Sequence, residues 1–336
     1  MTLTLARGAL TASPDGLSIR DFNASDADYA AVVAIGNLVL PEYQDTVEDW
    51  KHQDAHRPPH LKHRRLVAEL DGAIVGYAHY DQPEGMYHPQ AFHIFVAVRP
   101  DQQGRGVGRA LVAALMEALS PLDPLRLRAR TRADMERGVR FLQDLGFSEE
   151  QRDWESRLDV AAFDPAPFAG AEERLRAEGI QIVTAAELME RDPDHRRKLY
   201  ELDLELSRDV PRPEPFTGFA YETFEHYVFN SPNFLPDGYF VALDGDRYVG
   251  MSNLWRSQPD PSELYVGLTA VRRDYRRRGI ALALKLRSIA YARARGVRTL
   301  KTWNASTNRP MLSINEALGF VKQPAWIGFV RHLVRE

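Results

Sequence analysis

The sequence predicts a mixed α/β protein in which two related domains follow one another, each built on a mostly antiparallel sheet flanked by helices. Two observations carry this prediction. A glycine-containing segment occurs around Gly106 and again around Gly279, and the tripeptide Leu-Gly-Phe is centred on Gly146 and again on Gly319; both pairs are 173 residues apart. The chain has 336 residues, 44% of them hydrophobic, which is enough for two ordinary cores. The repeat therefore indicates two domains in tandem.

The first half has the pattern of several strands followed by two helices. Asp71-Gly72 predicts a tight turn between two strands. Regularly spaced leucines predict a helix over Arg105–Leu119, which Pro121 ends, and a second helix is expected to end near Leu145. The predicted strands are Leu17–Arg20, Leu66–Leu70, Ile74–His79, His93–Val98 and Leu125–Ala129.

The second half repeats this order. Asp244-Gly245 again predicts a turn, and Gly296 suits the position after a long helix. Between the halves, Ala161–Gly170 contains two prolines and shows neither helical nor strand periodicity. We therefore expect domains at 1–160 and 171–336 joined by this linker. The predicted strands are Phe240–Leu243, Tyr248–Trp255, Glu263–Val271 and Thr299–Trp303, and the predicted helices are Ile280–Arg295 and Asn308–Leu318.

Composition excludes several classes of protein. The formal net charge of −4 leaves no overall positive field for nucleic acid. Cysteine is absent, which excludes disulfides, thiol nucleophiles and cysteine-based zinc sites. Met1–Gly16 lacks the pattern of a secretory signal, and the longest apolar stretches are far too short to span a bilayer. We therefore expect a soluble, cytoplasmic protein without nucleic-acid or membrane partners.

The repeated glycine segment connects an apolar strand to a long helix. Backbone N–H groups that converge at such a junction, together with the positive end of the helix, favour a phosphate or diphosphate. A packing turn is the alternative for a single copy, but two copies in the same context favour anion binding. A dinucleotide fingerprint needs Gly-x-Gly-x-x-Gly, and a Walker loop ends in Gly-Lys-Ser/Thr; neither pattern is present.

Both segments resemble the Arg/Gln-x-x-Gly-x-Gly/Ala signature of the GNAT superfamily of acyl-CoA-dependent N-acetyltransferases, and the resemblance covers almost the whole chain as two domains. It implies acetyl-CoA as cosubstrate, a splayed strand pair that receives pantetheine, and a diphosphate on the loop amides. The implied acyl-CoA contacts in the second half are Val271, Arg276, Arg278, Gly279, Ile280, Ala281, Asn304 and Asn308. Those in the first half are Val98, Gln103, Gly104, Arg105, Gly106, Val107 and Gly108.

The two halves differ in their polar residues. Asn308 can serve equally as a helix N-cap ahead of Pro310. In the first half, the positions of Asn304, Asn308 and Asn315 hold Thr131, Met135 and Leu142. We therefore expect the second half to catalyse the reaction and the first half to be structural or regulatory.

The catalytic acid and base are not obvious from the sequence. Many family members place a tyrosine acid where this chain has Asn315, which cannot donate a proton with ordinary acidity. Glu263 and Tyr265 are two residues apart on a strand and share a face, so they are candidates for the base. A solvated strand-end carboxylate and a packed ring are the respective alternatives.

Histidines provide no convincing site. His93 lies in the equivalent strand of the first half, where a core or surface role is the simpler interpretation. His52, His56, His60 and His63 lie in a basic, proline-containing stretch without the helical spacing of a zinc site. We predict no metal.

The acceptor is expected to bind against the segment Leu199–Phe229, which is rich in acidic and aromatic residues. An acidic surface would attract a cationic amine, although a solvated helix face and core packing of the aromatic rings explain the same residues. We expect acetyl transfer to the primary amine of a small molecule. A noncatalytic acyl-CoA sensor and a protein or peptide N-acetyltransferase are the alternatives.

Overall fold

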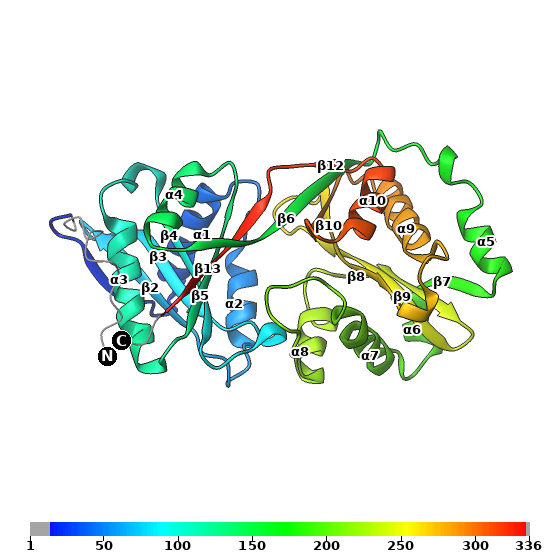
Figure 1. Ribbon diagram of the computed structural model, residues 1–336, viewed down its shortest axis with the longest axis horizontal. Helices are drawn as coiled ribbons and strands as arrows, with labels where there is room; N and C mark the ends of the chain where they lie inside the picture. Colours follow the sequence, from blue (N-terminus) through cyan, green and yellow to red (C-terminus); the bar gives the residue numbers. More distant parts are fainter. Residues whose placement is uncertain (1–13, 334–336) are drawn as a thin grey trace. The chain divides into compact units, whose positions relative to one another are not determined.

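The computed structural model describes residues 14–333, so most of the N-terminal segment Met1–Gly16 lies outside the described residues. The chain forms two compact units. Unit 1 comprises Met1–Gln151 and Trp326–Glu336, and unit 2 comprises Arg152–Ala325. Each unit has its own sheet and its own hydrophobic core (Figure 1).

The sheet of unit 1 has the strand order β1-β2-β3-β4-β5-β13, followed by the first residues of β6. From β1 to β13 all neighbours are antiparallel except β4 and β5, which are parallel. Its strands are β1 (Ser18–Asp21), β2 (Arg64–Leu70), β3 (Ala73–Asp81), β4 (Ala91–Val98), β5 (Arg126–Arg132), β6 (Ser148–Asp159) and β13 (Trp326–His332).

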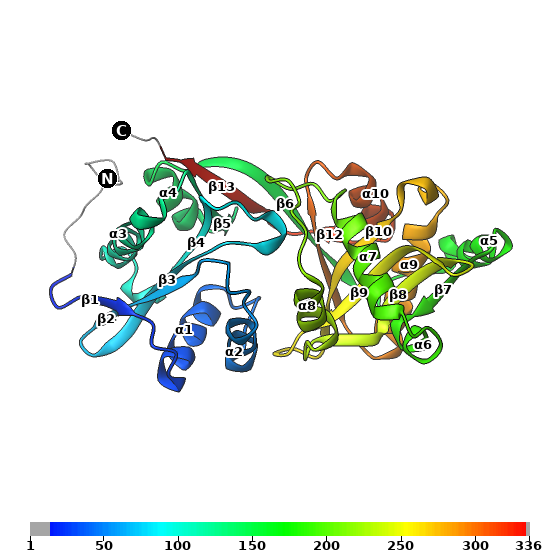
Figure 2. The same cartoon turned by 90° about the horizontal axis from the view of Figure 1, so that it is seen from below.

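Helices cover both faces of the unit 1 sheet (Figure 2). Its α-helices are α1 (Asp26–Val39), α2 (Val47–Ala55), α3 (Val107–Leu119) and α4 (Glu136–Asp144). Helix α3 places Leu111 and Leu115 in the larger core, whereas α1 buries Val32 and Ile35 in a second cluster against Tyr77 of β3. Ser25 and Thr46 cap the N-termini of α1 and α2 by accepting backbone N–H groups, which fixes where these helices begin.

The sheet of unit 2 has the order β11-β10-β9-β8-β7, with the remainder of β6 paired to the outer side of β11. Again only β10 and β11 are parallel. Its further strands are β7 (Ile180–Thr184), β8 (Phe234–Asp244), β9 (Arg247–Arg256), β10 (Glu263–Val271), β11 (Thr299–Ala305) and β12 (Val321–Lys322). The α-helices are α5 (Ala171–Ala177), α6 (Ala185–Arg191), α7 (His195–Ser207), α8 (Tyr221–Phe224), α9 (Ile280–Ala294) and α10 (Arg309–Ala317).

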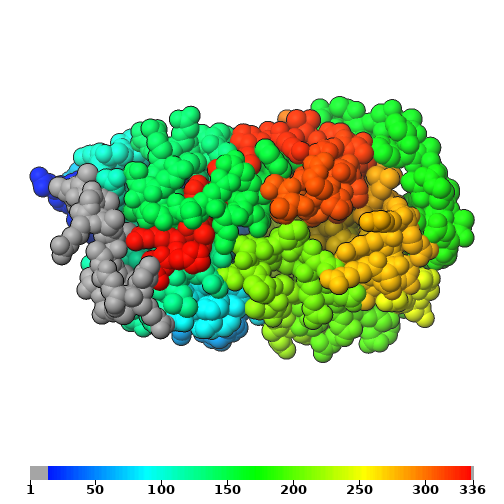
Figure 3. All heavy atoms as spheres, viewed as in Figure 1, coloured from blue at the N-terminus to red at the C-terminus, as the bar shows by residue number. Residues whose placement is uncertain are grey.

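In unit 2, α9 and α10 lie on one face of the sheet and α6, α7 and α8 on the other (Figure 1). The core beneath α9 includes Leu284 and Ile289, and the core beneath α7 includes Leu199 and Leu202. The surfaces of α9 and α10 adjoin in the space-filling view (Figure 3). These two faces give the sheet an α9/α10 side and an α7 side.

Each unit is completed by a strand from the other half of the chain. Strand β13 pairs with β5 from Trp326 to His332, and β6 pairs with β11 from Asp153 to Asp159. The units thus differ from the expected division at 160 and 171. The stretch 161–170, expected to be a linker, belongs to unit 2 and includes a short 3-10 turn at Ala166–Phe168. A repeat in the sequence shows that a unit occurs twice, but it does not show which copy of the last strand completes which sheet.

The predicted strands and helices that flank both glycine segments are confirmed, with shifts of a few residues at their ends. The predicted splay is also present. Strand β4 pairs with β5 only over Ala91–His93, and β10 pairs with β11 only over Glu263–Tyr265. Within residues 14–333, no helix combines the length and apolar character needed to cross a membrane.

Candidate active site

Strand β10 separates from β11 after Tyr265, so residues 266–271 have no strand partner on that side. An extended ligand can bond such an unpaired backbone as an added strand would. The opening leads from the sheet centre to the loop before α9, because Val271 ends β10 and that loop follows it. A long, narrow ligand therefore has a backbone-lined path along β10.

The loop at the end of β10 presents the N-terminus of α9. Gly279 is the N-cap with φ 84° and supplies no side-chain cap to the first turn. A Cβ atom there would meet nothing within 4 Å, so the approach to the helix end is open. Gly106 caps α3 in the same way with φ 92°. Both helix ends combine positive φ, which favours glycine, with a dipole that attracts an anion.

The loops are fastened to their strands by equivalent side chains. Arg276 Nε donates to the Val271 carbonyl at 3.0 Å, and Gln103 Nε2 donates to the Val98 carbonyl at 3.0 Å. These two residues are 173 positions apart, as are the two carbonyls. The Arg or Gln of the signature thus positions the loop through its side chain.

The other arginines of the second loop are also engaged. Arg276 and Arg273 both pair with Asp209, just beyond the end of α7. Hydrogen bonding first from Arg273 and then from Arg276 lowers the pKa of Asp209 to about 2. Arg278 pairs with Glu178 at 2.8 Å. The loop therefore already carries carboxylates that compete with an anionic ligand for its guanidinium groups.

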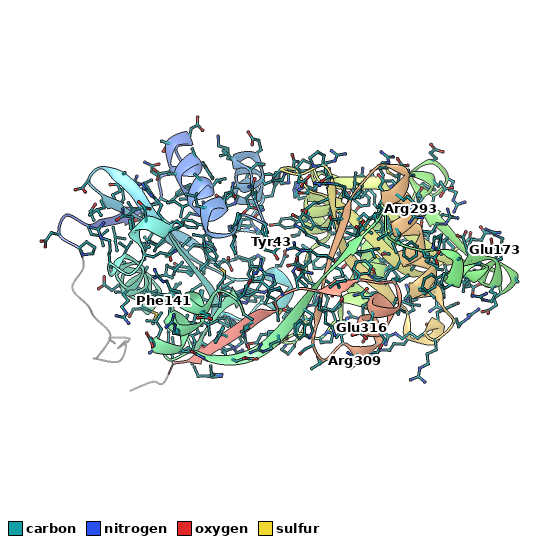
Figure 4. All side chains as sticks on the ribbon, turned by 90° about the horizontal axis from the view of Figure 1, so that it is seen from above. Tyr43, Phe141, Glu173, Arg293, Arg309 and Glu316 are labelled. Atoms are coloured by element: carbon teal, nitrogen blue, oxygen red, sulfur yellow. The ribbon has the colours of Figure 1, made fainter. Side chains whose placement is uncertain are left out.

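The remaining predicted loop residues divide into buried and open positions. Val107 and Ile280 are buried and anchor the first turn of each helix in its core. Ala281 is partly buried against the same core as Ile280. In unit 1, a Cβ at Gly108 would lie 3.4 Å from the ring of Phe141, which Figure 4 labels on α4.

Two further glycine-segment residues of unit 1 lie on the open side of the loop. Gly104 has φ 81°, and a Cβ there would come no closer than 3.9 Å to Arg137. Arg105 donates to Gln102 within the loop.

Strand β10 has a β-bulge that β4 lacks. Its register against β9 shifts by one residue between Val266 and Thr269, whereas β3 and β4 pair regularly over their whole ladder. Gly267 lies at the bulge, and a Cβ there would be 2.2 Å from Asn253 Oδ1 and 2.5 Å from Trp255 Nε1. A bulge leaves backbone groups unpaired and redirects them. Unit 2 therefore has backbone groups beside the opening that are available to a ligand, at a position where any side chain would displace Asn253 and Trp255.

Asparagines meet on the α10 side of the opening. Asn315 Nδ2 donates to Asn304 Oδ1 at 2.7 Å, and Asn315 is 1% exposed. Asn315 Oδ1 has no hydrogen-bond partner in the described part of the chain, and a buried unsatisfied oxygen is expected to bind a ligand or water. Asn308 accepts from the Met311 N–H at 3.4 Å as the N-cap of α10, and Arg309 and Glu316, labelled in Figure 4, pair along this helix at 3.4 Å.

The model of the Acetyltransferase (GNAT) family matches the chain twice, over residues 32–147 and 198–320. The chain belongs to the GNAT acetyltransferase family. The mycothiol acetyltransferase of Geodermatophilus obscurus is 27% identical over 275 residues, which cover 79% of this chain and 81% of that protein. The mycothiol acetyltransferase of Salinispora arenicola is 24% identical over 335 residues, which cover 92% of this chain and 99% of that protein.

Solved structures share the tandem GNAT fold. A tandem GNAT protein from the clavulanic acid biosynthesis pathway has a TM-score of 0.72 at 20% identity, covering 95% of this chain and 99% of that chain. A GCN5-related N-acetyltransferase from Sphaerobacter thermophilus has a TM-score of 0.68 at 19% identity, covering 96% and 97%. The predicted fold class and the prediction of an N-acetyltransferase are confirmed.

The predicted base candidates of this GNAT protein both have partners on the α7 side of the sheet. Glu263 pairs with Lys301 of β11 at 2.5 Å, and the Lys301 side chain is 2% exposed. The ring of Tyr265 lies 5.7 Å from that of Trp303. Glu263 is thus held by a buried cation and is not a solvated strand end. Sequence analysis missed Lys301, which lies opposite Tyr265 in the parallel register of β10 and β11.

The GNAT copy in unit 1 has a different set of side chains around its opening. Leu142 is buried in the core at the position of Asn315, and Thr131 Oγ1 points at Met135 Sδ, 3.9 Å away, where unit 2 has its asparagines. Unit 1 thus keeps the glycine loop of the GNAT signature but lacks both the bulge and the amide pair.

The histidines of unit 1 lie near β3. Burial lowers the pKa of His63 to about 4 and that of His79 to about 3, and arginines nearby act in the same direction. The rings of His52 and His56 are tilted by 43° with centroids 4.3 Å apart. Among residues 14–333, no group of three or more histidine, aspartate or glutamate side chains has the arrangement of a metal site.

Three of the seven acidic residues of the segment Leu199–Phe229 form ion pairs. Glu205 pairs with Arg272, Asp209 pairs with Arg273 and Arg276, and Glu225 pairs with Arg196. The aromatic residues are mainly packed: Phe224 belongs to the core beneath α7, and Phe219 stacks on it at 6.2 Å. Asp203 has no cationic partner within ion-pair distance in the described residues, and burial raises its pKa.

Proposed function

We propose that unit 2 transfers an acetyl group from acetyl-CoA to the primary amine of a small molecule. The observation that carries this proposal is the combination, in unit 2 alone, of an open helix N-terminus, a splayed β10 and a bulge at Gly267. Unit 1 has the first two features without the third. Family membership supports the chemistry, and the names of the curated relatives support acetyl transfer to a small molecule.

In this proposal, the α9 N-terminus holds the diphosphate through the amides of residues 278–281. The free backbone of β10 bonds the pantetheine arm along the opening. Unpaired backbone groups at the bulge bond the thioester carbonyl and stabilise the negative charge that develops on its oxygen. Asn304 of β11 and Asn315 of α10 approach the same region, where the unsatisfied Asn315 oxygen accepts a hydrogen bond from the coenzyme.

The acceptor amine binds, and its proton is removed, on the α7 side of the unit 2 sheet. Glu263 takes the proton of the attacking ammonium, while Lys301 fixes its carboxylate, and Tyr265 contacts the same face. The amine nitrogen then forms the new amide bond as the carbon–sulfur bond breaks. The departing thiolate takes its proton from solvent, because Asn315 has no acidic proton to give.

A peptide acceptor is the second candidate. The relatives include an N-alpha-acetyltransferase of Schizosaccharomyces pombe, 29% identical over 111 residues, which cover 32% of this chain and 69% of that protein. The relatives aligned over most of the chain carry a small-molecule name, which favours the first candidate.

Thiol release tests the proposal directly. The chain has no cysteine, so a thiol-reactive dye reports coenzyme A alone. Primary amines that carry no thiol, including amino sugars and amino acids other than cysteine, are compared with short peptides that also lack cysteine. We expect release above hydrolysis for at least one small amine; release with peptides only, or with no acceptor, contradicts the proposal.

Matched variants identify the active unit. Gly279→Asp places a negative charge and a strained φ at the open end of α9, and Gly106→Asp does the same at α3. We expect Gly279→Asp to lower kcat/KM by at least about 100-fold, the effect of losing a charge-stabilised binding step, and Gly106→Asp to leave it within about threefold. The reverse pattern would assign catalysis to unit 1.

A further inference from the structure

Two opposite charges on the α7 side of unit 2 remain without an ion pair. Asp203 lies in α7 and Arg212 in the loop that follows it. Their charges interact, since Arg212 lowers the pKa of Asp203, but no nitrogen of Arg212 lies within ion-pair distance of the carboxylate in the described residues. A buried charge without a partner is costly, and proteins retain one mainly where a ligand or catalysis requires it.

Asp203 has one oxygen free for a ligand. Its Oδ1 accepts from Ser207 Oγ at 3.0 Å, and in residues 14–333 its Oδ2 has no hydrogen-bond partner. Burial raises the pKa of this carboxyl to about 6, against opposing effects of Ser207 and Arg212. The side chain is only half-buried, so the group is both poorly solvated and reachable.

Arg212 is held from one side only. It donates through Nη1 to the Ser207 carbonyl and stacks on Phe216 at 4.8 Å from the ring centroid. Burial lowers its pKa, while Asp203 raises it. The rest of its guanidinium fork has no acceptor in the part of the chain that the structure describes. An Arg fixed at one edge presents the geometry that binds a carboxylate.

The side chains of Tyr239 and Trp255 lie in the core on the same α7 side of the sheet. Burial, and then the Asp203 charge, raises the pKa of Tyr239, which lies opposite Asn253 in the strand register and whose hydroxyl donates to Met251 Sδ at 3.1 Å. Asn253 Oδ1 accepts from Trp255 Nε1 at 3.1 Å, and both side chains lie against Gly267. The Asp203 charge thus acts on Tyr239, which lies opposite one of the side chains that cover the bulge.

We infer that Asp203 and Arg212 bind the two charges of a zwitterionic acceptor, an amine that also bears a carboxylate, such as a free amino acid. The ammonium group bonds the free oxygen of Asp203, and the carboxylate bonds the open edge of Arg212. Asp203 thereby orients the amine on the same side of the sheet as Glu263 and Tyr265. The inference rests on the proposed function and specifies its substrate class.

Kinetics with matched acceptors test the assignment. Each amino acid is compared with its decarboxylated amine and with its amide, and thiol release is followed. Wild-type protein is expected to prefer the amino acid by at least about tenfold in kcat/KM, the effect of one charge-assisted hydrogen bond. Arg212→Met should remove this preference by raising KM for the amino acid while leaving the decarboxylated amine within about threefold.

Asp203→Asn should lower kcat/KM for both acceptors by about 10- to 100-fold, since each uses the ammonium contact. Glu201→Gln, a charge change on an exposed residue of the same helix, is the control and should change neither. Equal rates for the amino acid and its amine in the wild type, or unchanged kinetics in both variants, would overturn the inference while leaving acetyl transfer intact. No thiol release with any amine would instead remove the proposed function itself.

Discussion

The two units bury side chains of different polarity at equivalent positions beneath α3 and α9, the helices that follow the glycine loops. In unit 1 all four of these positions are apolar, whereas in unit 2 all four are polar. The apolar set is Ala78, Val96, Val112 and Leu115, and the corresponding polar set is Ser252, Thr269, Lys285 and Ser288. Burying polar groups weakens a core unless they are bonded. These positions in unit 1 thus form an ordinary apolar core, whereas unit 2 buries polar groups there that stability alone does not require.

The hydroxyl groups of unit 2 form one network. Ser252 Oγ lies 2.8 Å from Thr269 Oγ1 and 3.3 Å from Ser288 Oγ, and Ser288 donates to the Leu284 carbonyl at 3.1 Å. The network joins β9, β10 and α9 next to the bulge. These hydrogen bonds hold the irregular part of β10 in one conformation. A binding site made of backbone groups requires such a fixed conformation.

The largest expected effect comes from removing the bulge that distinguishes the units. Gly267→Val should lower kcat/KM by at least about 100-fold, because its side chain displaces Asn253 and Trp255 and moves the backbone. Steady-state thiol release measures it, and a loss of about 1–3 kcal/mol in the free energy of unfolding accompanies it.

Gly328→Ala in β13 is the control for this change, since its Cβ would meet no atom closer than 3.5 Å. It should leave both activity and unfolding nearly unchanged. If Gly267→Val kept more than about a third of wild-type activity, the bulge would not be the feature that separates the two units.

The next test replaces Asn315 of the amide pair by leucine, the residue that unit 1 has at the equivalent position, Leu142. Asn315→Leu removes the donor to Asn304 and is expected to lower kcat by about tenfold, with a smaller effect on acetyl-CoA affinity measured by calorimetry. Asn315→Tyr should raise kcat above wild type if thiolate protonation limits the rate. A higher kcat in Asn315→Leu would contradict a role for the amide pair.

Lys285 gives a pH-dependent prediction. It lies against the Phe320 ring at 5.2 Å, and burial lowers its pKa from 10.5 to about 7. Below pH 7 the lysine is charged in both states and the folded state bears the full desolvation penalty; between pH 7 and 10.5 folding releases its proton, so stability rises with pH.

Lys285→Met should therefore raise the melting temperature most below pH 7, by an amount corresponding to at least about 1 kcal/mol. The difference should shrink as the pH rises toward 10. A gap that does not change with pH would show that the pKa of Lys285 is the same in the folded and unfolded states. The matched Val112→Met variant of unit 1 should show no pH-dependent change.

The smallest expected effect concerns the stability contribution of Asp203. Its pKa is raised to about 6, so above pH 6 the folded state holds a poorly solvated charge, and below about pH 4 the carboxyl is protonated in both states. Arg212 and Tyr239 are the ionisable groups that face it. Asp203→Asn should melt at a higher temperature than wild type at pH 8 and at the same temperature near pH 4, as measured by calorimetry.

The features that occur in both halves of the sequence could be predicted. The features that depend on strand register or on contacts between distant residues could not. Gly106 and Gly279 predicted the loops because glycine is required where φ is positive, and the splay followed from the family resemblance. The bulge at Gly267 shifts the alternation of buried residues from Leu264 and Val266 to Thr269 and Val271. It was missed because the residues that face the other side there, Leu268 and Ala270, are also apolar and hide the shift. The Lys301 partner of Glu263 and the Asp209 partner of Arg276 depend on register and on a distant loop, which single residues do not reveal.

Strand β6 was also not predicted, and its composition explains why. Its sequence, Ser-Glu-Glu-Gln-Arg-Asp-Trp-Glu-Ser-Arg-Leu-Asp, is mostly charged, and only part of it is buried. Its place between two other strands, and not its side chains, makes it a strand. Position in the sheet overrides local composition here.

The exchange of terminal strands has a consequence for how the protein is made. As the nascent chain leaves the ribosome, residues 14–151 emerge first, yet the sheet they form lacks β13 until residues 326–332 have been translated. The exposed edge of β5 must remain unpaired throughout synthesis of unit 2, and such edges are prone to misassociation. The sheet of unit 1 can therefore be completed only after residues 326–332 at the end of the second half have been synthesised.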